Sequence, residues 1–163
     1  MAKGDKDVIE HMINDLKAYV EGVFKDYNEM TEERLELQMA AIRLLSKAKW
    51  TRASQNVTEF FPYLRMEYEQ KVINADQFAE VINCMSEIAS GKTAAILSEY
   101  LDSLNRNLED DVLPETAVIM AVIKSLGRLG DKAAFDSLLS VTYLDYPEEI
   151  SIAARQALSD LKW

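Results

Sequence analysis

The stretch SGKT, Ser90 to Thr93, has the residue types that end a phosphate-binding loop, whose chemistry would be the binding of a nucleotide. Such a loop needs a further glycine at position 86, where this chain has Ser86. It also needs a strand before it, whereas the apolar residues from 78 to 88 recur at helical spacing. The pattern therefore predicts a turn between two helices, with Gly91 as the left-handed C-cap of the first helix.

Nucleophilic and metal chemistry have few candidates in this chain. His11 and Cys84 are the only residues of their types, so one of each is too few for a four-ligand zinc site. A Ser-His-Asp or Cys-His arrangement would have to use His11, which no nucleophile motif flanks. We expect a partly exposed structural histidine and a small buried apolar cysteine. The acidic run from 109 to 111 lacks the alternating pattern of a calcium loop. We therefore expect no catalytic residue, no metal and no cofactor.

A basic patch surrounds one of the two tryptophans. Lys47, Lys49 and Arg52 lie close to Trp50 in the sequence, with Arg43 one helical turn before Lys47. Lysines and arginines beside an aromatic ring could hold a phosphate and stack a base. Basic residues near a helix C-terminus also stabilise the helix dipole, and the same patch could contact a protein. The sequence leaves these three interpretations open.

The elements that must position these residues are helical. Of 163 residues, 48% are apolar and 28% charged, with only 5 glycines and 3 prolines, which is typical of long helices. A single cysteine fits a reducing compartment, and the start MAKGDKDVIEHM lacks the apolar core of a secretory signal. No apolar run approaches the roughly 20 residues of a membrane span. We expect a cytoplasmic protein with no membrane partner.

The net charge of −10 is unevenly distributed. Residues 1–72 hold 11 basic and 13 acidic side chains, whereas residues 73–163 hold 7 and 15. An acidic surface repels phosphate backbones, so we expect no nucleic-acid partner.

Apolar periodicity and capping signals predict eight helices. Pro62 lies inside the third, which it should kink or split. Asn74 and Gln77 have the spacing of a capping box at the start of the fourth. The sixth contains AVIMAVI, Ala117 to Ile123, which is apolar on all sides and should be buried. The predicted ranges are about 5–28, 32–48, 50–70, 92–107, 131–144 and 147–161, with the fourth helix starting after Asn74 and the sixth near Pro114.

The turn sequences repeat. SGKTAAI at 90–96 is similar to LGDKAAF at 129–135, and a weaker copy, KAKWTRA, begins at Lys47. Copies about 40 residues apart, built from helices alone, predict stacked helical hairpins. Small residues such as Ala154 and Ala157 are expected where neighbouring helices pack closely.

The last hairpin resembles the HEAT-repeat family, whose second helices typically read D-x-P-x-x-V-R-x-x-A-x-x-A-L. DYPEEISIAARQAL, Asp145 to Leu158, follows this pattern, and the LGRLGD turn at 126–131 is also typical of the family. Where the family often has arginine, this chain has Ser151 and Ile119. The resemblance implies an all-α fold, a right-handed α-solenoid of about four HEAT-like hairpins that forms one domain over 1–163.

The resemblance and the missing catalytic motifs suggest a non-enzymatic module that binds another protein on its extended surface, especially the face of the second helices. The alternative is a HEAT-like nucleic-acid-binding protein or small-ligand enzyme that uses the Trp50 patch. A second candidate surface is the C-terminal hairpin, where Tyr143, Tyr146 and Trp163 are either packed against the last helix or exposed as an aromatic surface. We expect any homodimer to use this hairpin.

Overall fold

The computed structural model describes residues 4, 6–8, 10–11, 14–15 and 32–163. The residues among them that precede 16 are helical. Most of the predicted first helix lies outside the described residues.

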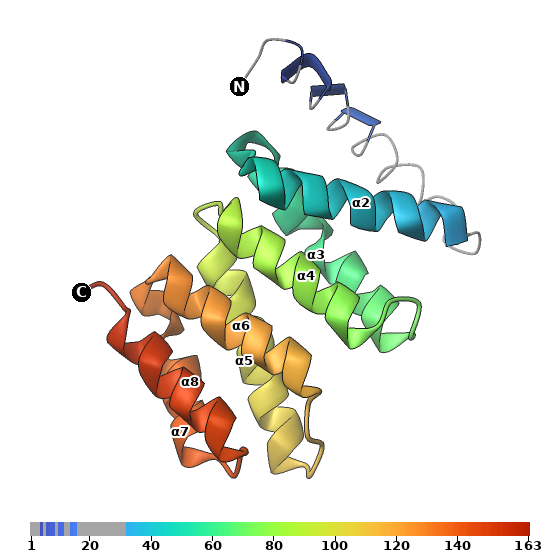
Figure 1. Cartoon of the computed structure of the whole chain (residues 1–163). Coiled ribbons are helices and arrows are strands. Elements are labelled where there is room, and N and C mark those ends of the chain that lie inside the picture. Colours follow the sequence, from blue (N-terminus) through green and yellow to red (C-terminus); the bar gives the residue numbers. More distant parts are fainter. Residues whose placement is uncertain (1–3, 5, 9, 12–13, 16–31) are drawn as a thin grey trace.

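From residue 32 onward the chain is a succession of helices joined by short turns (Figure 1). The part that the structure describes contains no β-strand, only an isolated bridge between Asp131 and Lys162. The fold is therefore all-α, as predicted. The helices are α2 (Glu32–Ala48), η2 (Thr51–Ala53), α3 (Ser54–Glu69), α4 (Ala75–Glu87), α5 (Thr93–Glu109), α6 (Thr116–Leu129), η3 (Lys132–Ala134), α7 (Phe135–Tyr143) and α8 (Glu148–Ser159).

Several helix boundaries follow from local chemistry. The bounds of α2 match the prediction. Asn74 Oδ1 accepts from the Gln77 backbone N–H, and Gln77 Oε1 accepts from the Asn74 N–H, which confirms the capping box at the start of α4. Of the two effects predicted for Pro62, a kink or a split, the structure excludes the split, since α3 runs through this residue as one helix.

The helices form two layers (Figure 1). In one layer α4 packs closely against both α2 and α6, and α6 packs against α8. In the other, α5 packs against α7, whereas α3 and α5 approach each other less closely. The pairs α3–α4, α5–α6 and α7–α8 join the layers. No helix among the described residues is both long and apolar enough to cross a membrane.

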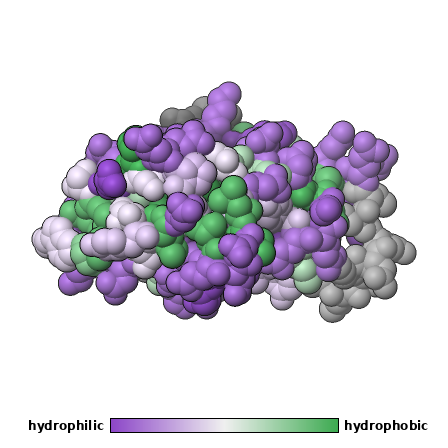
Figure 2. Space-filling view, turned by 90° about the horizontal axis from the view of Figure 1, so that it is seen from below, coloured by the Kyte–Doolittle hydropathy of each residue, from purple (hydrophilic) through white to green (hydrophobic). Residues whose placement is uncertain are grey.

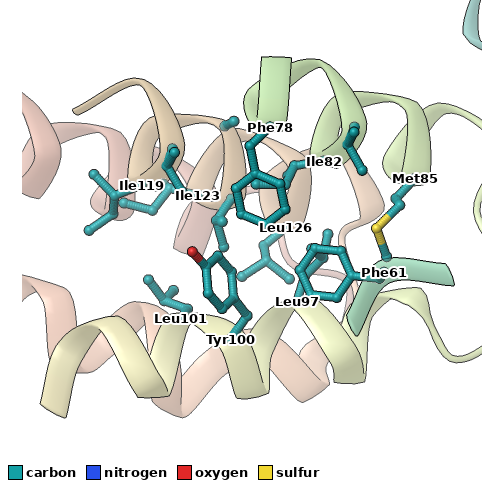
Figure 3. Packing of buried hydrophobic residues seen from close by; sticks show 14 of the residues in the cluster. Phe61, Phe78, Ile82, Met85, Leu97, Tyr100, Leu101, Ile119, Ile123 and Leu126 are labelled. Atoms are coloured by element: carbon teal, nitrogen blue, oxygen red, sulfur yellow. The ribbon is translucent and has the colours of Figure 1, made fainter. Parts of the chain in front are cut away.

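Aromatic rings from three consecutive helices occupy the centre of the core (Figure 3). Phe78 of α4 stacks on Phe61 and Tyr68 of α3, with ring centroids 5.7 and 4.8 Å apart. Tyr100 of α5 meets Phe61 and Phe78 edge-on, at 5.6 and 5.7 Å. Offset and edge-on ring pairs stabilise a core beyond their area alone. This cluster joins both layers.

The apolar helix α6 lies inside the fold, as predicted. Val118, Ile119, Val122 and Ile123 are fully buried. On its C-terminal turn, Gly127 allows α8 to approach so closely that an added Cβ would lie 3.1 Å from Ala157. Ala157 is itself 3% exposed, which confirms the close packing expected there.

The two similar turns have different backbones. Gly130 caps α6 in the left-handed region, with φ 63°. The prediction that Gly91 does the same for α4 is wrong. Gly130 is the only glycine with positive φ among the described residues, and Ile88 is the C-cap of α4. The segment that follows α8 also holds Gly130 in place, because the Gly130 carbonyl accepts from the Lys162 N–H at 2.8 Å.

Polar side chains also link the α2, α4 and α6 layer. Ser46 Oγ donates to Glu87, and the Arg128 guanidinium lies 3.9 Å from the same carboxylate. Arg128 also donates to Ser86 Oγ at 2.6 Å. Glu87 follows Ser46 by 41 residues, and Arg128 follows Glu87 by the same interval. This row of polar side chains, the polar chain, therefore takes one residue from each of three successive hairpins.

A carboxyl group is buried between α2 and α3. Gln38 Nε2 donates to Glu67 Oε2 at 2.8 Å, and the two side chains are 0% and 1% exposed. The other oxygens, Gln38 Oε1 and Glu67 Oε1, have no hydrogen-bond partner. Burial raises the pKa of Glu67 above its ordinary value, and the bond from Gln38 only partly opposes this rise. The neutral acid therefore fits this site better than the carboxylate.

Candidate binding surfaces

The SGKT turn satisfies its own polar groups. The Ser90 backbone N–H donates to Thr93 Oγ1 at 2.9 Å. The hydroxyl of Thr58 in α3 lies 3.3 Å from Ser90 Oγ. Thr93 is fully buried at the start of α5. The turn therefore ties α3 to α5, and its geometry is that of a helix start held by hydroxyl groups.

A groove of about 720 Å³ lies beside this turn, which we name the α3–α5 groove. It exists because α3 and α5 approach each other less closely than the helices of the other layer. Its surface is mixed, with neutral polar groups, one acid, one lysine and apolar Pro62 and Ile96. The lining residues are Ser54, Gln55, Thr58, Glu59, Pro62, Ser90, Gly91, Lys92 and Ile96.

A second groove of about 340 Å³ lies between the C-terminal ends of α5 and α7, and we name it the α5–α7 groove. Tyr143 stands at its rim with 82% of its surface exposed. Two acids of α5, Asp102 and Glu109, lie on either side of Arg106 along the helix. The remaining lining residues are Asn105, Ser140 and Leu144.

Exposed apolar residues lie at the same end of the molecule. The α5–α6 turn, which follows Glu109 directly, exposes Val112 and Leu113 at 57% and 55%. Figure 2 views the molecule from the side on which the α5–α6 and α7–α8 turns lie, and it shows apolar atoms bordered by hydrophilic ones. The α5–α7 groove thus opens near an apolar surface with a polar border.

The Trp50 patch is less basic than its sequence indicates. The Arg43 guanidinium makes a two-bond ion pair with Glu80, at 2.6 and 3.2 Å. Arg52 pairs with Glu10 at 3.0 Å and lies over the Trp50 ring. The ring is half-buried against the core, and its N–H has no partner. Only the two lysines of the patch, 47 and 49, are exposed without an ion pair among the described residues.

The predicted aromatic surface of the C-terminal hairpin does not exist as one patch. The prediction that Tyr146 belongs to a binding surface is wrong, because this residue is 6% exposed and its hydroxyl donates to Asn105 Oδ1 at 3.0 Å. Trp163 packs edge-on against Phe135 at the opposite end of α7 from Tyr143, although 83% of it stays exposed. Tyr143 alone lines a groove.

The remaining candidate residues lie as expected. Cys84 is fully buried, and burial raises the pKa of its thiol to about 12, so it is no nucleophile at neutral pH. His11 is exposed on a helix. Within the described residues no group of three His, Cys, Asp or Glu side chains could hold a metal.

Asp102 and Arg106 were not among the residues predicted from the sequence, and Glu109 was considered only within the acidic run from 109 to 111. A signal for them existed, because their spacing of three and four places them on one face of α5. That spacing is also ordinary for a solvated helix face. What distinguishes them is Tyr143, which comes from a different helix and joins them only in the folded chain.

Comparisons with protein-family models, with curated proteins and with solved structures find no match for this chain.

Proposed function

We propose that this chain is a non-enzymatic protein-binding module built as a short, right-handed HEAT-like α-solenoid. The proposal for the architecture rests on the two helix layers, on packing between consecutive hairpins, and on a polar chain whose members recur at the hairpin period. Such an array offers extended surface more readily than a deep catalytic pocket.

The observation that carries the binding function is the position of the two grooves. Both lie in the α3, α5 and α7 layer, between first helices of successive hairpins. The binding face we propose is therefore this layer, rather than the face of the second helices that the sequence suggested. Tyr143 in the α5–α7 groove is exposed, and tyrosine is enriched in protein interfaces.

The nucleic-acid alternative has less support. Two arginines of the Trp50 patch already pair with carboxylates, and Trp50 packs against the core. A binding site for a phosphate backbone needs free positive charge, because the release of counterions drives that association. The net charge of −10 opposes the same association.

Affinity capture from native lysate tests the function. The wild-type chain is compared with Tyr143→Ala, with Gln55→Arg in the α3–α5 groove, and with Trp163→Ala as an equally exposed aromatic control. We expect a protein that the wild type and Trp163→Ala retain and that one groove variant loses. Titration calorimetry with that purified protein must then reproduce the difference. If both groove variants capture the same proteins as the wild type, this result would contradict the proposed binding face.

A further inference from the structure

We propose that the α5–α7 groove binds a cationic peptide segment that carries an aliphatic or aromatic anchor residue. This inference rests on the proposed protein-binding function and specifies the chemistry of the partner. Three features support it, namely unpaired negative charge, an exposed tyrosine at the rim of the groove, and apolar residues beyond it.

The charge around the groove is strongly negative, and no ion pair within the described part of the chain compensates it. Asp102 and Glu109 line the groove. The ion pairs among the described residues involve Glu10, Glu69, Glu80 and Glu87, and none involves an acid at this end of the molecule. The exposed carboxylates of the two adjoining turns and the start of α8 are Asp110, Asp111, Glu115, Asp145, Glu148 and Glu149, of which Glu115 accepts a hydrogen bond from the Tyr68 hydroxyl.

One positive charge, Arg106, lies among these eight carboxylates. Like charges held close together at a surface repel one another, and a partner that brings lysine or arginine relieves that repulsion. Such complementarity also accelerates association and excludes acidic partners. Charge therefore selects a basic partner for this end of the molecule.

Charge alone does not describe the groove, because its rim is apolar in part. Tyr143 is 82% exposed and Leu144 is half-buried beside it. Tyrosine is enriched among residues that dominate binding energy, since its ring offers a large apolar area with little conformational entropy to lose. A cavity of about 340 Å³ is at the lower end of the range for ligand pockets, which suits an anchor side chain.

A second copy of the chain is a poorer occupant than a basic peptide. A symmetric dimer through this end would place the same acidic surface on both sides of the interface. Directly opposed carboxylates would repel each other and cost free energy. The basic stretch around Trp50 could not serve instead, because its two arginines already pair with Glu80 and Glu10. Residues 1–72 as a whole also hold more acids than bases.

Fluorescence anisotropy with labelled synthetic peptides of about twelve residues tests the proposal. One peptide carries several lysines around a central Leu-Phe pair, a second replaces that pair by Gly-Ser, a third keeps the pair and replaces lysine by glutamate, and a fourth keeps it among serines. We expect the first to bind at least about tenfold more tightly than each of the others. Its affinity should fall as salt is raised, because exposed charges are screened.

Variants locate the binding. Tyr143→Ala, Asp102→Lys and Glu109→Lys should each weaken the first peptide, the tyrosine variant by about tenfold or more. Trp163→Ala controls for loss of an exposed aromatic, and Glu36→Lys on α2 controls for the change in net charge. Both controls should bind like the wild type. Circular dichroism of each variant shows that its helices are intact.

Three results would overturn the inference. If the lysine peptide without the Leu-Phe pair binds as tightly as the first, the groove does not hold an anchor. If Glu36→Lys weakens binding as much as Glu109→Lys, the affinity for the peptide depends only on the net charge of the protein. A captured protein that depends on Tyr143 but binds Asp102→Lys and Glu109→Lys normally would remove the cationic partner and leave the proposed protein-binding function intact.

Discussion

The helices before and after the α4–α5 turn each bury a group of polar side chains, and the two groups differ in how completely their hydrogen bonds are made. In the C-terminal half, α5 to α8, Asn105 donates to the Ser137 carbonyl at 3.1 Å and accepts from Tyr146 at 3.0 Å. In the N-terminal half, α2 to α4, Gln38 and Glu67 share one hydrogen bond and leave two oxygens without a partner.

This difference separates the two halves by their response to pH. The Asn105 group consists of amide, hydroxyl and carbonyl groups, none of which changes charge near neutrality; burial even raises the pKa of Tyr146 to about 12. The Gln38–Glu67 pair contains a buried carboxyl that must lose its proton as pH rises. Of these two groups, only the Gln38–Glu67 pair makes stability depend on protonation.

The largest expected effect concerns the Asn105 network, which consists of the hydrogen bonds of Asn105 with Ser137 and Tyr146. Tyr146→Phe removes the donor to Asn105 Oδ1 and leaves a buried acceptor without a partner, which should lower the free energy of unfolding by about 1–3 kcal/mol. Urea denaturation followed by circular dichroism measures the loss. Tyr143→Phe removes an exposed hydroxyl and should leave stability unchanged. Equal midpoints for the two variants would show that the Asn105 network contributes nothing.

The second prediction concerns the left-handed turn of the C-terminal half. Gly130→Ala should destabilise the chain by about 1–2 kcal/mol, because φ 63° disfavours a side chain. The new Cβ would also lie 3.1 Å from the Asp160 carbonyl oxygen. Thermal denaturation measures the change. A melting temperature equal to that of the wild type would mean that this turn relaxes at no cost.

The third prediction concerns the incomplete pair of the N-terminal half. Because the folded state raises the pKa of Glu67, the wild type loses stability as pH rises from the ordinary value of 4.5 through the raised one. Glu67→Gln keeps a neutral partner for Gln38 and supplies an amide donor, so it should be more stable by about 1 kcal/mol above that interval. Below pH 4.5 the two proteins should be alike.

Urea titrations at several pH values measure this difference. Glu59→Gln, at an exposed position on the same helix, controls for the loss of one negative charge. A gain in stability from Glu67→Gln that is the same at every pH would contradict a neutral buried acid.

The smallest expected effect comes from the turn between the halves. Gly91 lacks a positive φ, and an added Cβ would meet no atom within 4 Å. Gly91→Ala should therefore stabilise the chain by roughly 0.4–1 kcal/mol, because alanine restricts the unfolded chain more than glycine does. Thermal denaturation beside Gly130→Ala gives the contrast directly. Destabilisation by both variants would restore the capping role that the sequence predicted for Gly91.

The helices themselves were largely predictable from the sequence. Local signals determine them, such as the apolar periodicity of α6 and the Asn74–Gln77 capping box, and both are confirmed. The two glycine turns were not equally predictable, because their sequences are alike and only one is held by the C-terminal segment through Lys162. That contact joins residues from different parts of the chain, so local sequence does not contain it.

The surfaces were less predictable for the same reason. Tyr143 and Tyr146 are three residues apart and of one type, yet one is exposed and the other lies against Asn105. Which tyrosine points inward depends on how α7 sits on α5, and periodicity beyond the end of a helix no longer indicates it. The pairing of Arg43 and Arg52 with Glu80 and Glu10 also reduces a basic patch that looked continuous in the sequence.

The aromatic cluster of Phe61, Tyr68, Phe78 and Tyr100 has a consequence for cooperativity. In an array where each hairpin touches mainly its neighbours, unfolding can begin at an end and stop at any weak junction. Here the rings cross from α3 and α4 to α5, so the junction between the two halves is among the most extensively packed parts of the core. The halves differ in their polar chemistry, but neither can lose its structure without exposing rings that the other half helps to bury. They should therefore melt as one unit.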